Sequence, residues 1–153
     1  MDQENAGSPK PFKYKELKVY ASTEWLVGNQ KKYRQVFDRY DTSYIYAELS
    51  FYNKAFDEED WEVNVVLKCF KVNGDKSEKV CVLPLKKKVS RHENIVYFRE
   101  GWGNKKDGRF WKKGTYYWEA WVEGEKLGTK YFYVEDVGVR ERMKIIPMLM
   151  LFL

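Results

Sequence analysis

The stretch from Gly114 to Gly138 constrains the fold most, because it predicts one long β-hairpin. Its sequence is GTYYWEAWVEGEKLGTKYFYVEDVG, in which glycines punctuate two arms filled with aromatic and β-branched residues. Alternate residues of each arm are apolar, and this period of two gives a sheet one buried side. The predicted inward residues of the hairpin are Tyr116, Trp118, Ala120, Val122, Phe132 and Val134.

Five further segments carry strand patterns, at residues 15–23, 42–53, 61–72, 79–89 and 94–98. Residues 31–40 are ambiguous and are interpreted as an irregular strand. With about seven strands, frequent turn signals and no long helical pattern, the sequence predicts an all-β, antiparallel, immunoglobulin-like two-sheet sandwich. The predicted core comprises Leu17, Val19, Ile45, Ala47, Leu49, Val63, Val65, Leu67, Phe98, Trp118, Ala120, Phe132 and Val134.

Local signals also place the segment 79–89 within a sheet. Asn73-Gly74-Asp75 predicts a turn before it, so this segment and 61–72 are expected to pair. Pro84 cannot donate a ladder hydrogen bond and therefore predicts an edge strand or a bulge. Pairing around the turn would let Cys69 and Cys81 face each other, and both are predicted to be reduced thiols.

At 153 residues the chain is expected to hold one folded domain. Residues 1–14 are expected to form a disordered leader, 15–138 the sandwich, and 139–153 an apolar tail or the start of a missing segment. The apolar run 143–153 is shorter than the roughly 20 residues that cross a bilayer, so membrane binding is not expected. The leader does not resemble a signal peptide and the chain has only two cysteines, which favours the cytoplasm.

No catalytic constellation is recognisable, so the chain is not expected to be an enzyme, and no cofactor or metal is expected. His92 is the only histidine, without the partners of a zinc site or a triad. The segment 103–110 resembles a phosphate-binding loop, but Arg109 and Phe110 stand where lysine and serine or threonine are needed. The acids at 57–60 are consecutive, whereas calcium ligands are spaced.

The basic aromatic loop at residues 101–113 suggests an alternative function, because interleaved rings and cations bind carbohydrates or nucleic acids. The candidate ligand-binding residues are Trp102, Lys105, Lys106, Arg109 and Trp111. The competing interpretation is that these aromatic rings close one end of the sandwich. The formal charge of +5 permits an acidic partner without requiring nucleic acid, which is not the expected partner.

A docking face for a protein partner is predicted from the residues opposite the core set. In a sandwich these outer positions are normally polar, and here they are aromatic. They are Tyr44, Tyr46, Tyr117, Trp121, Tyr131 and Tyr133. If their strands share a sheet or flank each other, they form an exposed apolar patch of the kind that marks an interface. Alternatively, the rings lie singly or are covered by residues 25–40 or by the apolar tail.

Three segments resemble a known family: VYASTEW at 19–25, TSYIYAELSFYN at 42–53 and YFYVEDVG at 131–138. Together they resemble the N-terminal β-sandwich domain that precedes the ATPase module in bacterial AAA-family ATPases similar to sporulation stage V protein K. The resemblance covers residues 15–138 and consists of strand patterns without catalytic motifs. It implies a non-catalytic interaction or regulatory module whose partner is a protein, either such an ATPase or a second copy.

Overall fold

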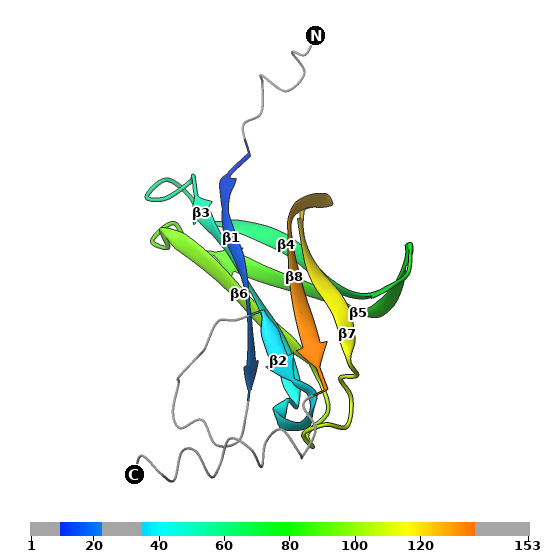
Figure 1. Ribbon diagram of the computed structural model, residues 1–153. Helices are drawn as coiled ribbons and strands as arrows, with labels where there is room; N and C mark the ends of the chain where they lie inside the picture. Colours follow the sequence, from blue (N-terminus) through cyan, green and yellow to red (C-terminus); the bar gives the residue numbers. More distant parts are fainter. Residues whose placement is uncertain (1–9, 23–34, 137–153) are drawn as a thin grey trace, which may run out of the picture.

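The computed structural model describes residues 10–22 and 35–136, which form two β-sheets (Figure 1). One short 3-10 helix, η1 (Arg39–Asp41), accompanies the strands in this part of the chain. The strands are β1 (Phe12–Ser22), β2 (Val36–Asp38), β3 (Tyr44–Asn53), β4 (Trp61–Asn73), β5 (Lys76–Val89), β6 (Ile95–Gly103), β7 (Gly114–Val122) and β8 (Glu125–Glu135). Among the described residues no helix is long and apolar enough to cross a membrane.

The two sheets have three and five strands, in the orders β1-β3-β6 and β2-β8-β7-β4-β5. The predicted all-β two-sheet sandwich is therefore confirmed. Every strand pair is antiparallel except β2 with β8, which is parallel. The strand β2 occupies only three residues of the ambiguous stretch 31–40, whose residues 31–34 lie outside the described part. As Pro84 predicts, β5 is an edge strand of its sheet.

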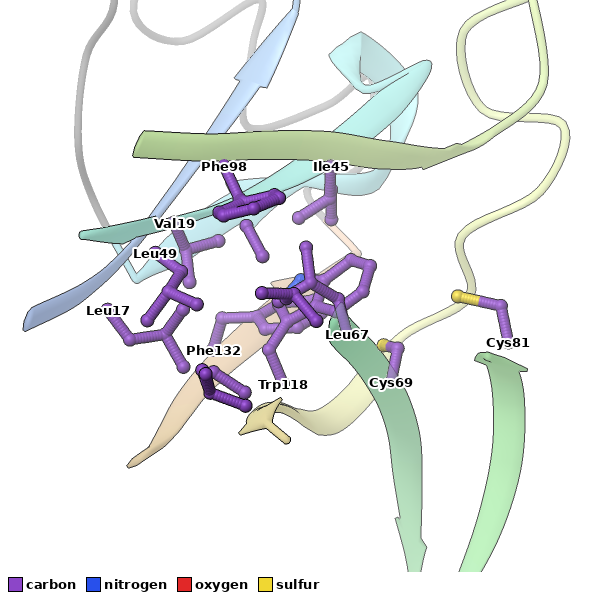
Figure 2. Close-up of a cluster of buried hydrophobic side chains, with 14 of the residues drawn as sticks. Leu17, Val19, Ile45, Leu49, Leu67, Cys69, Cys81, Phe98, Trp118 and Phe132 are labelled. Carbon is purple, nitrogen blue, oxygen red and sulfur yellow. The ribbon is translucent and has the colours of Figure 1, made fainter. Parts of the chain in front are cut away.

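The core forms between the inward faces of the two sheets, as the period of two in the sequence predicts. All thirteen predicted core residues are buried, each with 6% or less of its surface exposed. In Figure 2, Leu17, Val19, Ile45, Leu49 and Phe98 of the three-stranded sheet lie against Leu67, Trp118 and Phe132 of the five-stranded sheet. Burying one such side chain stabilises the fold by about 1.5–3 kcal/mol, so this layer is the main source of stability.

The long hairpin forms as predicted, with β7 and β8 joined by a two-residue turn. The central residues, Glu123 and Gly124, both have positive φ, 49° and 81°. Positive φ at both positions is the geometry of a type I′ turn, whose twist matches that of the flanking strands. Glu123 accepts this conformation while its carboxylate accepts a hydrogen bond of 2.7 Å from the backbone N–H of Asn64 on β4.

Asn53, the last residue of β3, ties the loop before β4 and the turn before β6 to its strand. Its buried side-chain amide donates to the carbonyl oxygens of Ser90 (3.3 Å) and Glu93 (2.9 Å). Its side-chain oxygen accepts from the backbone N–H of Ala55 at 3.0 Å and from Trp61 Nε1 at 2.9 Å. One fully bonded amide therefore positions both the loop that contains the acidic run and the turn before β6.

The sandwich begins earlier than expected, because β1 starts at Phe12 and the predicted leader ends at residue 14. Phe12 is buried, with its ring centroid 5.6 Å from that of Phe51 and 6.3 Å from that of Trp61. The alternating pattern before Leu17 is masked by lysines, which explains the late predicted start. The predicted apolar tail, residues 139–153, and residues 25–34 of the possible covering segment 25–40 lie outside the described residues.

Neighbouring residues of β4 test which face of the five-stranded sheet is inside. Replacing fully buried Leu67 with alanine should lower the free energy of unfolding by about 2–5 kcal/mol, because a cavity remains. The control, Val66→Ala, changes an outward side chain and should cost about 1 kcal/mol or less. Urea denaturation followed by tryptophan fluorescence measures both. Equal losses would contradict the assigned faces.

Candidate docking face and loop site

The six predicted docking residues lie in two different sheets. Tyr44 and Tyr46 belong to β3 in the three-stranded sheet, whereas the other four lie on β7 and β8 in the five-stranded sheet. Because the inner faces of the sheets share the core, their outer faces point away from each other. The condition for a single six-residue patch, that the strands share a sheet or flank each other, is therefore not met. A period of two identifies the outward residues of a strand but carries no information about which sheet the strand joins.

On the three-stranded sheet, Tyr46 packs within its own face. Its ring stacks on that of Tyr20 with a centroid distance of 4.9 Å and an interplanar angle of 4°. It also lies over Gly101, where an added Cβ would be 2.6 Å from a ring carbon of Tyr46. Tyr20 is itself buried. The ring surface of Tyr46 is thus occupied by neighbours of the same sheet.

The rest of that outer face holds charged side chains beside the exposed rings of Tyr52 and Tyr97. Arg99 donates from Nε to the buried carboxylate of Glu48 at 2.9 Å and lies 4.7 Å from the Tyr97 ring centroid. Beside them the pKa of Glu16 is lowered, chiefly by a hydrogen bond from Lys15. A surface with these internal ion pairs is more typical of a solvated face than of an apolar interface.

An aromatic row crosses the outer face of the five-stranded sheet. Phe70 of β4 pairs with Tyr117 of β7, which pairs with Tyr131 of β8. Their ring centroids lie 5.2 Å apart for Phe70 and Tyr117 and 5.0 Å apart for Tyr117 and Tyr131. Tyr133 continues along β8. We call Phe70, Tyr117, Trp121, Tyr131 and Tyr133 the aromatic face.

The β8 end of the aromatic face is the more exposed end. Tyr131 and Tyr133 have 44% and 37% of their surface exposed. Tyr133 pairs with Val36 of β2, which is 53% exposed and extends the apolar surface to the sheet edge. Phe70 and Val36 were not among the predicted docking residues. The sequence could have identified Phe70, because it alternates with the inward residues of its strand. It could not identify Val36, because this residue lies in the ambiguous segment 31–40.

Trp121 lies beside the row of rings and is surrounded by charged side chains. Lys68 Nζ lies 4.1 Å from its ring centroid, and its Nε1 donates to the Glu119 carboxylate at 2.9 Å. The same carboxylate is 3.7 Å from Lys126 Nζ. The cation over the ring and the alternating charges give this flank of the aromatic face a polar rim.

The orientation of the rings bears on which ligand fits. Phe70 and Tyr117 stack with an interplanar angle of 25°, so each ring turns a face toward its neighbour on the next strand. Carbohydrate and base platforms need exposed ring faces for stacking. Rings whose faces are turned toward each other, with one hydroxyl per tyrosine, instead suit the side chains of another protein.

One of the five predicted ligand-binding residues of the basic aromatic loop, Trp111, is not accessible to a ligand. Trp111 is fully buried, and its ring makes edge contacts with Tyr116 and Phe132 at centroid distances of 5.1 and 5.6 Å. Its Nε1 donates to the carbonyl oxygen of Trp102 at 3.2 Å. As a ligand contact Trp111 is therefore a wrong prediction, because it closes the end of the core as the competing interpretation held.

The other four loop residues, Trp102, Lys105, Lys106 and Arg109, are exposed. The loop backbone is anchored to the segment after η1, since Gly108 N–H donates to the Thr42 carbonyl at 3.1 Å. These residues therefore remain available as the alternative binding site.

The remaining candidates for chemistry stay separate. His92 is exposed, and no group of three or more His, Cys, Asp or Glu side chains is arranged to hold a metal within residues 10–22 and 35–136. Asp60 of the acidic run accepts a hydrogen bond from the Arg91 N–H at 2.8 Å, which lowers its pKa. That carboxylate thus stabilises a turn.

A groove of about 510 Å³ lies between β1 and β8. It is lined by Tyr14, Lys15, Glu16, Leu17, Lys18, Val19, Gln35, Thr129 and Lys130.

No protein-family model and no curated protein matches the sequence. Among solved structures, the chain is similar to Pseudomonas fluorescens alkylpurine DNA glycosylase AlkC bound to DNA containing an abasic site analogue. The identity is 14% and the TM-score 0.54, over 82% of this chain and 30% of that one. It is also similar to a β-glucosidase from Listeria innocua in complex with isofagomine, with 12% identity, a TM-score of 0.48, and 83% and 16% coverage.

A third similar structure is the β-D-glucoside glucohydrolase from Trichoderma reesei, at 9% identity and a TM-score of 0.44, over 81% of this chain and 19% of that one. The chain spans less than a third of each of these three proteins. At such identities the similarity to the glycosylase shows the fold alone, and the resemblance to ATPase-associated domains stays a prediction.

The two loop tryptophans provide a matched test of the finding that Trp111 is a core residue and Trp102 a surface residue. Trp111→Ala should destabilise the protein by about 3–5 kcal/mol, because it empties a fully buried site. Trp102→Ala removes a ring that is 37% exposed and should cost about 1 kcal/mol or less. Thermal and urea unfolding of the two variants measure the difference. A Trp111→Ala variant as stable as the unchanged protein would contradict the burial of Trp111.

Proposed function

We propose that the protein is a non-catalytic module that binds another protein through the aromatic face of its five-stranded sheet. The observation that carries the proposal is the exposure of Tyr131, at one end of a row of three contacting rings, and of Tyr133 two residues further along β8. Tyrosine is enriched among residues that dominate binding energy at interfaces, because a large rigid ring is coupled to a hydroxyl. The aromatic centre and charged flank match the arrangement of an apolar core with a polar rim.

The partner is proposed to be a protein in the cytoplasm. The resemblance to the domain that precedes AAA-family ATPase modules makes such an ATPase the first candidate, with a second copy of this chain as the other outcome. The charged groups on the flank, Lys68, Glu119 and Lys126, have both signs, which suits a mixed protein surface better than a polyanion. No catalytic role is assigned to any residue.

Two pairs of exposed tyrosines test the docking face. Tyr131→Ser with Tyr133→Ser should leave the melting temperature nearly unchanged, since both rings are on the surface, and should weaken association at least about tenfold. The matched control, Tyr52→Ser with Tyr97→Ser, removes two rings of 39% and 38% exposure from the three-stranded sheet and should leave association intact. Sedimentation velocity of the protein alone, and pull-down with an AAA-family ATPase of the same cell, measure association. If both pairs weaken binding equally, or the first pair unfolds the protein, the aromatic face is not the docking site.

The alternative is that the exposed loop residues bind a carbohydrate or nucleic acid. In that case oligonucleotide binding should weaken with added salt and be lost when Lys105, Lys106 and Arg109 are changed to glutamate, because phosphate contacts release counterions. Saturable binding of neutral glycans, lost with Trp102→Ala, would favour the carbohydrate version. Gel-shift and calorimetric titrations measure both, and the absence of binding in each would reject the loop as a ligand site.

A further inference from the structure

The two cysteines are brought together by the pairing of β4 with β5. Cys69 and Cys81 are direct partners in the antiparallel register and both side chains belong to the core, with 0% and 6% of their surface exposed. Figure 2 shows them on neighbouring strands at the edge of the core cluster. Both are free thiols. The expectation that the two residues could face each other is therefore confirmed.

The spacing is close to what a disulfide needs. Directly opposite residues in an antiparallel pair have Cβ atoms about 4.5–5.5 Å apart. A disulfide requires about 3.5–4.5 Å between the same atoms and tolerates a Cα separation of about 4.4–6.8 Å, which includes that of opposed strand residues. Only a small approach of one strand to the other is required to form the bond.

A β-bulge beside the cysteine pair permits this approach. The register shifts next to the pair, because Cys69 is opposite Cys81 whereas Phe70 is opposite Lys79, so that Val80 is the extra residue of a bulge. The strand β5 is also an edge strand, bonded to a neighbour on one side only. A bulged edge strand can move toward β4 without displacing a third strand, whereas Cys69 is held between β5 and Trp118 of β7.

The two thiols differ in reactivity. Burial raises the pKa of the Cys69 thiol. The hydrogen bond from Cys69 lowers the pKa of the Cys81 thiol, which is also the more exposed of the two. Since the thiolate is the nucleophile, Cys81 is the thiol that attacks the peroxide first. A lone buried thiol is usually inert, but here a second thiol stands opposite to complete the reaction.

We propose that Cys69 and Cys81 form a redox-active dithiol that hydrogen peroxide converts into a cross-strand disulfide. In the first step the Cys81 sulfur takes one oxygen from the peroxide, the O–O bond breaks and water leaves, giving a sulfenic acid. In the second step the Cys69 sulfur attacks the Cys81 sulfur, the S–S bond forms and the S–O bond breaks, and the Cys69 proton joins the departing hydroxyl to give a second water. Two thiols are thereby oxidised by two electrons, and one peroxide is reduced to two waters.

Peptide mapping of the full chain tests the proposal without any substitution. The protein is reduced with dithiothreitol, freed of it, exposed to hydrogen peroxide, and then unfolded in N-ethylmaleimide before digestion and mass spectrometry. The expected result is a linked pair of peptides that contain Cys69 and Cys81, two hydrogens lighter than their sum and without maleimide. Dithiothreitol should restore labelling of both peptides. If both cysteines take up maleimide after peroxide, or if Cys81 carries added oxygens and no link to Cys69, the proposal is wrong.

Single variants test the assigned order of the two steps. In Cys69→Ala the sulfenic acid of Cys81 has no resolving thiol, so it should be trapped by dimedone. In Cys81→Ala the buried Cys69 should give no dimedone adduct. The opposite pattern would overturn the assignment of Cys81 as the attacked residue. Circular dichroism of each variant shows whether it is folded, and the wild-type mapping stands independently if one is not.

Discussion

A two-layer sandwich buries only one face of each sheet, and the surface chemistry of this protein depends on that constraint. Along β7 the residues Tyr116, Trp118 and Ala120 enter the core, so the intervening Tyr117 and Trp121 are forced outward. The same applies to β8, where Phe132 and Val134 are buried between exposed tyrosines. Shifting the register of a strand by one residue would exchange its inward and outward side chains. The larger apolar content of the inward side chains prevents such a shift.

The consequence is a row of outward rings, of which some pack on each other and others stay exposed. Phe70 and Tyr117 pack on each other, and the row becomes more exposed toward Tyr131 and Tyr133. On the three-stranded sheet the outcome differs, because Gly101 lets the ring of Tyr46 lie against the sheet beside Tyr20. Two surfaces that look alike in sequence thus differ: Tyr46 packs on Tyr20 in the three-stranded sheet, whereas Tyr131 and Tyr133 of the five-stranded sheet stay exposed.

Alternation within a strand made the core predictable, from Leu17 at one end of the chain to Val134 at the other. The assignment of strands to sheets was not predictable in this way, since it depends on contacts between residues far apart in sequence. That is why Tyr44 was grouped with Tyr131 although they lie in different sheets. The two interpretations of Trp111 could not be separated from the sequence because aromatic residues in a basic loop follow no period, and its burial results from packing against Tyr116 and Phe132.

The central claim is that the aromatic face of the five-stranded sheet contacts a protein partner. Photo-cross-linking in living cells tests it most directly, with a benzoyl-phenylalanine placed at Tyr131 and, in a second strain, at Tyr97 on the three-stranded sheet. Both positions are exposed, at 44% and 38%. The account predicts one discrete cross-linked species at Tyr131, identifiable by mass spectrometry, and none at Tyr97. Equal cross-linking at both positions, or a species at Tyr97 alone, would contradict it.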